Sequence, residues 1–249
     1  ETGLPVYGAN SMPVTGTTSF RADAADGTAT VTFTFDGSTM AGRTLVVYET
    51  LQWYNDTLAS HTDLDDPDQT VHFPKIHTSA VDSESGDHNS IADTSVTIVD
   101  TVSYSNLIAD GREYTVTGTL MDKVTGEKLL DAQGNEITSI VTFVPEDSSG
   151  TVDVTFTFDG SHLAADGAQV VVFESVQYKG REVAVHADIN DLAQTVLFPA
   201  IHTSAVVGDT GEKEIEASGV VTVVDTVSYC NLAPGETYTV VGSLINKTT

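Results

Sequence analysis

The chain has almost no cysteine and few basic residues. Cys230 is the one cysteine among 249 residues, so no disulfide can form within the chain. Lys and Arg total 10 against 36 Asp and Glu, for a formal net charge of -26. This argues against nucleic acid and anionic membrane surfaces as partners, because both are bound through clustered cationic side chains. If the protein works outside the cell, covalent support must come from a bond other than a disulfide.

Long apolar runs are also missing. The longest, such as 170–173, are too short to span a membrane. No segment has a convincing helical period, although "HADINDLAQ" at 186–194 has room for one short helical turn. Apolar residues instead alternate with Thr in 28–35 and 151–158, the pattern of a strand with one buried face. Many short strands separated by turn residues predict an all-β protein of tandem Ig-like β-sandwich domains.

The sequence repeats at a spacing of 125 residues. "HTDLDDPDQTVHFPKIHTSA" at 61–80 recurs as "HADINDLAQTVLFPAIHTSA" at 186–205, and "VDTVSYSNL" recurs as "VDTVSYCNL". A period of this size indicates whole domains in tandem and not a small-unit solenoid. Residues 76–200 hold one complete unit. Residues 1–75 match the later part of a unit and residues 201–249 its beginning, so these two segments are complementary parts of one domain.

Each unit places polar residues in apolar strand contexts. Asp100 lies within "TIVDTV", Glu174 ends "VVVFE", and Thr78 lies in "IHTSA". A buried carboxylate is costly unless it is paired or protonated. The simplest interpretation places each residue at a solvated strand end. Their recurrence as a group in both units favours a common site.

Taken together, these motifs resemble the Thr–Gln ester-bond domains, or VaFE-type repeats, of Gram-positive cell-surface adhesins. The resemblance is carried by "IHTSA", "IVDTVSYSNL", "YTVTGTLMDKVTG", "GTVDVTFTFDG", "VVVFE" and "VHADINDLAQTV". It implies an ester formed when a Thr oxygen attacks a Gln side-chain carbonyl and ammonia leaves. The reactive pairs are then Thr78 with Gln194 in the complete unit, and Thr203 with Gln69 across the two partial units.

The resemblance also implies a location and a role. The chain is expected to be a structural stalk module, extracellular and anchored to the cell wall through parts outside this chain. Its partners would be neighbouring repeats, while the host ligand would bind elsewhere. No cofactor is expected, and the chain would not be an enzyme, because each site reacts once with itself.

The chemistry requires a base and an acid beside the reactants. A Thr hydroxyl is a weak nucleophile and needs a group that takes its proton. His186 and its counterpart His61 are the candidate bases, because the pKa of histidine lies near neutrality. His77 and His202 are rivals, but adjacent strand residues point to opposite faces, so His77 is expected to face away from Thr78.

Carboxyl groups complete each predicted site. Asp100 and Glu174 in the complete unit, and Asp225 and Glu49 in the partial ones, would orient or charge-balance it. Two carboxyls held close together share a proton, which leaves one of them neutral and able to donate a hydrogen bond.

The positions of the predicted pairs have a mechanical meaning. Thr78 opens the complete domain and Gln194 nearly closes it, so an ester would tie the first strand to the last. In a rod of tandem domains, the two partial units lie at opposite ends of the chain. They could then meet only between chains, head to tail, through strand complementation. The alternative is that the chain is a stretch of a longer repeat array.

Three other functions compete with a crosslink between Thr and Gln. "HTDLDDPDQ" offers a possible calcium loop through Asp63, Asp65, Asp66 and Asp68, which would make the chain a calcium-dependent or ligand-binding module. A hydrolase using Thr, His and Asp is disfavoured, because no nucleophile elbow is present. A Lys–Asn isopeptide is disfavoured because the motif positions carry Thr and Gln.

Overall fold

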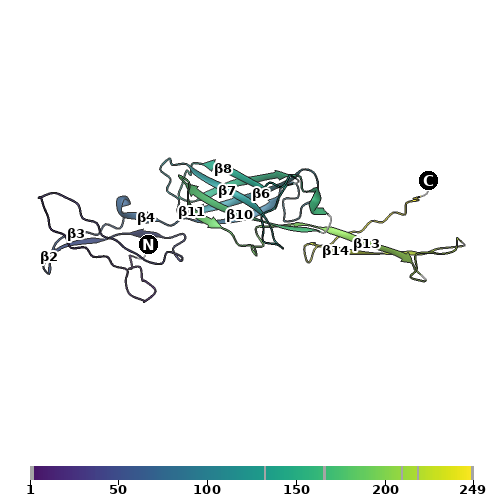
Figure 1. Ribbon diagram of the computed structural model, residues 1–249, viewed down its shortest axis with the longest axis horizontal. Helices are drawn as coiled ribbons and strands as arrows, with labels where there is room; N and C mark the ends of the chain where they lie inside the picture. Colours follow the sequence, from purple (N-terminus) through teal and green to yellow (C-terminus); the bar gives the residue numbers. More distant parts are fainter. Residues whose placement is uncertain (1–2, 132, 165–166, 209, 218, 248–249) are drawn as a thin grey trace.

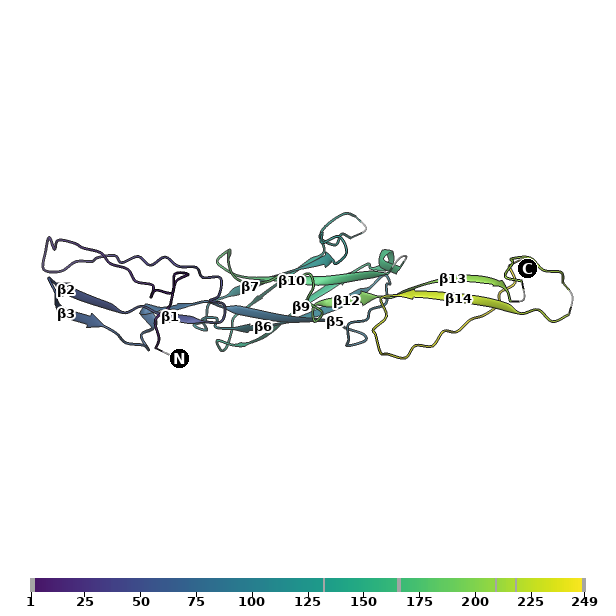
Figure 2. The same cartoon turned by 90° about the horizontal axis from the view of Figure 1, so that it is seen from below.

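The protein is an elongated row of three parts. The computed structural model describes residues 3–131, 133–164, 167–208, 210–217 and 219–247. A closed β-sandwich lies in the middle, with β2 and β3 toward one end of the row and β13 and β14 running toward the other (Figure 1). The view from below shows the same order (Figure 2). The two partial units therefore lie at opposite ends of a rod.

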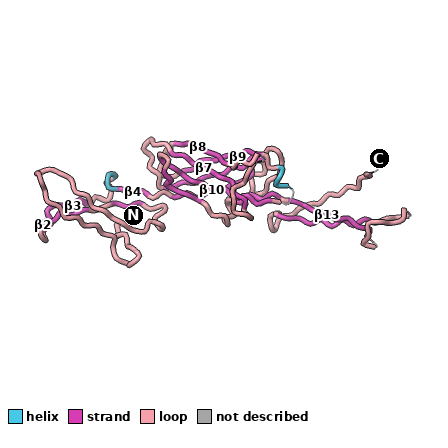
Figure 3. Tube along the Cα trace, in the orientation of Figure 1, coloured by secondary structure: helices cyan, strands magenta, loops and turns pink. Residues whose placement is uncertain are grey.

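Nearly all of the regular secondary structure in the described residues is strand, which confirms the all-β prediction (Figure 3). The strands are β1 Thr44–Val46, β2 Glu49–Trp53, β3 Asp56–His61, β4 Thr70–His72, β5 Lys75–Asp82, β6 Val96–Ser105, β7 Tyr114–Asp122, β8 Thr138–Phe143, β9 Gly150–Phe158, β10 Ala168–Tyr178, β11 Arg181–His186, β12 Thr195–Phe198, β13 Ala200–Val207 and β14 Val223–Cys230. Two 3-10 turns, η1 Pro67–Gln69 and η2 Ser161–Ala164, complete the list.

The helical turn considered for 186–194 is absent. Asp188 Oδ1 accepts a hydrogen bond from the Asn190 amide at 2.9 Å, and Asp191 Oδ1 accepts one from the Ala193 amide at 2.8 Å. The equivalent bond in the first unit, from the Asp68 amide to Asp66 Oδ1, caps η1, so these bonds do not account for the difference between the units. None of the helical segments in the described part of the chain is long and apolar enough to cross a membrane.

Two antiparallel sheets form the central sandwich. One has the order β5-β6-β9, and the other has the order β11-β10-β7-β8 with β12 also paired to β10. Inward residues of both sheets, including Ile98, Leu120, Phe156 and Phe198, form one core. Each such side chain contributes roughly 1.5–3 kcal/mol when fully buried. Gly118 on β7 belongs to this close packing, because a Cβ there would lie 2.5 Å from the ring of Phe156.

The partial units lack some of the strand pairings that form in the central unit. The alternating segment 28–35 was expected to be a strand, and this was wrong, because the described structure assigns it no strand. In the central unit the matching strand β9 pairs with β6. The counterpart of β6 is β14, which lies at the other end of the molecule (Figure 1). Residues 28–35 therefore have the side-chain pattern of a strand without its hydrogen-bonding neighbour.

Candidate functional site

Thr78 and Gln194 meet inside the central sandwich. Both residues are 0% exposed, and Gln194 Nε2 donates a hydrogen bond to Thr78 Oγ1. Thr78 lies on β5, and Gln194 directly precedes β12. The backbone holds the glutamine on both sides, because the Ala80 amide donates to the Ala193 carbonyl at 2.9 Å and the Val172 amide donates to the Gln194 carbonyl at 3.1 Å. A hydroxyl and a primary amide are thus fixed in contact in the buried interior.

A pair of buried carboxyls lies beside them. Asp100 on β6 is 0% exposed and Glu174 on β10 is 1% exposed. Glu174 Oε2 accepts a hydrogen bond from Gln194 Nε2 at 2.6 Å. Burial, reinforced by the neighbouring Asp100, raises the pKa of Glu174 to about 10. Burial also raises the pKa of Asp100. Glu174 is therefore protonated at neutral pH and available as a hydrogen-bond donor.

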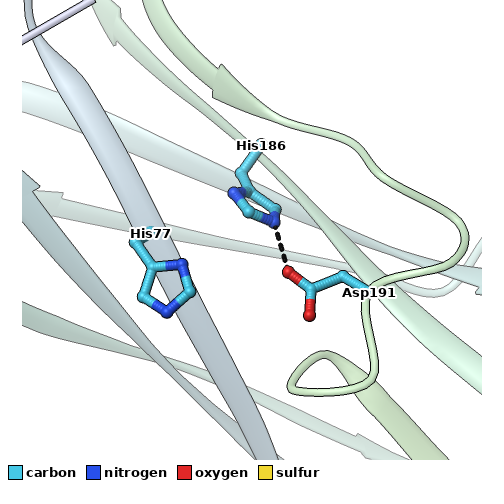
Figure 4. Close-up of side chains that lie close together, drawn as sticks. All are labelled: His77, His186 and Asp191. Atoms are coloured by element: carbon cyan, nitrogen blue, oxygen red, sulfur yellow. Dashed lines mark hydrogen bonds and ion pairs between the residues drawn. The ribbon is translucent and has the colours of Figure 1, made fainter.

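His186 approaches the site from the edge of the sheet. It ends β11 directly opposite Glu174 in the β10–β11 register. Its Nε2 lies 2.8 Å from Asp191 Oδ2, and its ring centroid lies 5.8 Å from that of His77 (Figure 4). Within the described residues its hydrogen bond goes to Asp191 and not to Thr78.

Asp191 is ionised beside this histidine. Burial acts to raise its pKa, but hydrogen bonds from the Ala193 amide and from His186 outweigh burial, and the pKa is lowered. The charged carboxylate favours the tautomer in which His186 carries a proton on Nε2, which leaves Nδ1 as the basic atom.

His77 lies on the outer face, as the strand alternation predicted. It is exposed, whereas Thr78 beside it is fully buried. His77, His186 and Asp191 form the group of described residues whose side-chain atoms lie close enough together to hold a metal ion.

The proposed calcium loop at 61–69 has no comparable cluster among the described residues. Asp63 and Asp66 instead accept hydrogen bonds from the amides of Asp65 and Asp68.

The partial units carry the matching half-sites. Glu49 is opposite His61 in the β2–β3 register, as Glu174 is opposite His186. Glu49 Oε2 and Gln69 Oε1 are buried and have no hydrogen-bond partner in the described structure. At the other end, Ala205 pairs with Asp225 as Ala80 pairs with Asp100.

The second half-site is open to solvent. Thr203 and Asp225 are both exposed. Each end therefore presents half of a site that is closed in the central unit, and the fold does not bring Thr203 and Gln69 together.

The sequence motifs did not identify one residue of the candidate site. Asp191 is the hydrogen-bond partner of His186. The first unit repeats this contact between His61 Nε2 and Asp66 Oδ2 at 2.9 Å. The signal was a His followed by an Asp five residues later in both units.

The arrangement holds the components of an acyl transfer. It contains a hydroxyl nucleophile, an amide electrophile, a neutral carboxyl that can donate to the amide, and an imidazole held by a carboxylate. Proximity in a dry, rigid site replaces the encounter of two reactants in solution.

Known families and solved structures include likenesses to this chain. A family model described as "T-Q ester bond containing domain" matches residues 1–73, 74–198 and 199–249. A search of curated proteins found no match. Among solved structures, a Mobiluncus mulieris adhesin described as containing intramolecular disulfide, isopeptide and ester bond cross-links is 13% identical, with a TM-score of 0.42 over 63% of this chain and 76% of that one.

More distant likenesses are sugar hydrolases. A putative β-galactosidase from Bacteroides fragilis is 13% identical, with a TM-score of 0.35 over 56% of this chain and 19% of that one. The family model covers essentially the whole sequence in three consecutive matches. The chain therefore belongs to the family of T-Q ester bond containing domains.

Proposed function

We propose that the central unit closes an ester between Thr78 and Gln194 without an external catalyst, and that the chain serves as a stalk module of a bacterial surface adhesin. The observation that carries this is the contact of a fully buried Thr hydroxyl with a fully buried Gln amide beside a buried carboxyl pair. Family membership and the rod-like row of units support the stalk role. On this proposal the protein acts outside the cell, and each site reacts once.

The reaction is an exchange of amide for ester. Thr78 Oγ1 forms a bond to Gln194 Cδ, and the bond from Cδ to Nε2 then breaks. The hydroxyl proton is taken by Nδ1 of His186 and passed to the departing nitrogen, which leaves as ammonia. No oxidant, reductant or water is consumed. Removing the proton as the bond forms is worth about 10²–10⁴ in rate.

Glu174 is the proposed acid. Gln194 Oε1 is buried without a hydrogen-bond partner in the described structure. Rotating the amide by half a turn exchanges its nitrogen and oxygen and would bring this oxygen to the protonated Glu174. A hydrogen bond there would stabilise the negative charge that develops on the oxygen during attack. Burial keeps Glu174 protonated, and Asp100 reinforces this by placing a second carboxyl beside it.

Intact mass under denaturing conditions tests the proposal. The parent chain should weigh about 17 Da less than its sequence for one ester, because one ammonia is lost. Thr78→Val keeps the shape of the side chain but removes the nucleophile, so its mass should be complete. Thr78→Ser keeps a hydroxyl and should retain the deficit. A complete mass in the parent chain would overturn the ester.

We propose further that the two half-sites join head to tail between copies, through a Thr203–Gln69 ester. Core positions support this: Leu120 is fully buried, whereas its counterpart Leu244 in the C-terminal unit is 87% exposed. The segment 28–35 lacks the neighbour that β14 of another copy would supply. Such a contact is heterologous and propagates into a filament.

Complementary variants test the contact between chains. Thr203→Val and Gln69→Ala each remove one partner, so neither variant should form covalent multimers alone. Their mixture should form a covalent dimer and stop there, while the parent chain should form a ladder in a denaturing gel. Absence of both dimer and ladder would refute this ester and leave the one in the central unit unaffected.

A further inference from the structure

The two junctions between units are built around a repeated asparagine that the crosslink does not use. Asn106 follows β6 and Asn231 follows β14, at the same place in "SYSNL" and "SYCNL". Both have a positive φ, of 63° and 56°. Asparagine tolerates this left-handed backbone, and glycine does so more easily. The backbone conformation alone therefore does not explain the choice of asparagine.

The side chain of Asn106 contacts the preceding unit. Its Nδ2 donates to the carbonyl oxygens of Arg43 at 2.6 Å and Phe73 at 3.2 Å. Its Oδ1 accepts from Thr44 Oγ1 at 2.9 Å and lies 2.9 Å from His72 Nδ1. An asparagine side chain offers two donor hydrogens and two acceptor lone pairs, and all four are used here.

Asn231 makes the same contacts one unit further along. Its Nδ2 donates to the carbonyl oxygens of Ala168 at 3.2 Å and Phe198 at 3.3 Å. Its Oδ1 accepts from Gln169 Nε2 at 2.9 Å. These three partners lie 125 residues after Arg43, Phe73 and Thr44. The geometry is therefore reproduced at two junctions, although two of the three partner residues differ in type.

The acceptors lie where a pair of strands ends. Ala168 and Phe198 form the terminal pair of the β10–β12 ladder, and Asn231 donates to both of their carbonyls. At the first junction Thr44 pairs with His72 in β1–β4, and Arg43 and Phe73 lie just beyond this pair. Each asparagine thus extends the ladder of one unit with an amide from the next.

The covalent connection at each junction is short. Pro199 alone separates β12 from β13, and Phe73 and Pro74 separate β4 from β5. Proline fixes its own φ and restricts the residue before it. The asparagine adds a second attachment, distant along the chain from the first. Two attachments at different points resist rotation, whereas one short linker still permits bending about itself.

We propose that Asn106 and Asn231 lock consecutive units at a fixed angle, and that their partner surface is the end of the two-stranded ladder in the preceding unit. The lock makes the row of units a stiff rod. Without it, the default expectation for linked domains is relative motion. The proposal is independent of ester formation, because every contact involved lies outside the Thr–Gln site.

Distances between spin labels in adjacent units test the lock. In a Cys230→Ser background, labels at Leu58→Cys and Val124→Cys span the first junction, at side chains that are 61% and 84% exposed. Asn106→Gly suits the backbone and removes only the side-chain bonds. The distance distribution should broaden by about twofold or more in this variant, because an unlocked junction permits relative motion. An unchanged width would overturn the proposal.

Two controls separate the lock from general loss of structure. A label pair at Val124→Cys and Val185→Cys lies within the central unit, and its distribution should not change in the Asn106→Gly chain. Broadening of that pair as well would contradict a role confined to the junction. Asn135→Gly removes an asparagine that bonds Asp131 within the same unit and should leave the distance across the junction unchanged.

Discussion

The ester should make the central unit strongly resistant to heat, and the size of the effect follows from the chain length that it encloses. Thr78 and Gln194 are 116 residues apart. Treated as a crosslink that limits the unfolded chain, a loop of this length contributes about 5 kcal/mol. For a unit of about 125 residues, this corresponds to roughly 15–20 °C in Tm. Thr78→Val removes the ester and leaves the unreacted Gln194 amide buried without the Thr78 oxygen as a partner, which adds about 1 kcal/mol to the loss.

Calorimetry of the Thr78→Val and Thr78→Ser chains measures this effect. The serine variant loses one buried methyl group, worth about 1 kcal/mol, but keeps the nucleophile. The valine variant should therefore melt about 15–20 °C below the serine variant. A serine variant that showed the ammonia deficit and yet melted within about 5 °C of the valine variant would refute this expectation. The loop would then not restrict the unfolded state as assumed.

Three further outcomes follow from the site. Glu174→Gln removes the acid and should leave the mass complete, whereas Glu182→Gln on the exposed edge should keep the deficit. Asp191→Asn should slow ester formation on refolding by about tenfold or more, measured by timed mass spectra, with Asp188→Asn as the unaffected control. In the Thr78→Val chain, Tm should decrease as the pH is raised from about 5 to about 9. The pKa of Glu174 is about 10 in the folded chain, against a usual value of 4.5. Protonated Glu174 therefore stabilises the fold fully below pH 4.5, and this contribution is lost as the pH rises toward 10. Adding Glu174→Gln should reduce this slope, and Asp100, whose pKa burial also raises, accounts for the slope that remains. An unchanged slope would assign it to another group.

Alternation and repetition made most of the fold predictable. Polar–apolar alternation predicted the strand at 151–158, which is β9, and the repeat spacing predicted which residues belong to one unit. Residues 28–35 have the same pattern but form no strand, because the pattern records which face is buried and not which neighbour is present. Pairing depends on segments distant in sequence, and periodicity contains no information about them.

The candidate site was also predictable from the sequence only in part. The structure gathers Thr78, Gln194, Glu174 and Asp100 as the motifs predicted, and their catalytic roles stay predictions. The bond between His186 and Asp191 was not foreseen, because a loop rich in Asp is equally typical of calcium binding. The contact depends on how residues 187–194 turn back to the edge of β11, which is set by local side-chain hydrogen bonds.

The positions of Thr78 and Gln194 also limit how far the molecule can lengthen. From Thr78 to the equivalent Thr203 the main chain runs 125 residues, of which an ester bypasses the 116 between Thr78 and Gln194. The remaining nine, at about 3.4 Å each, have a contour length of about 30 Å, against about 425 Å for the open chain. Even a completely denatured unit would then be almost inextensible. The stalk would keep its reach when its fold is lost.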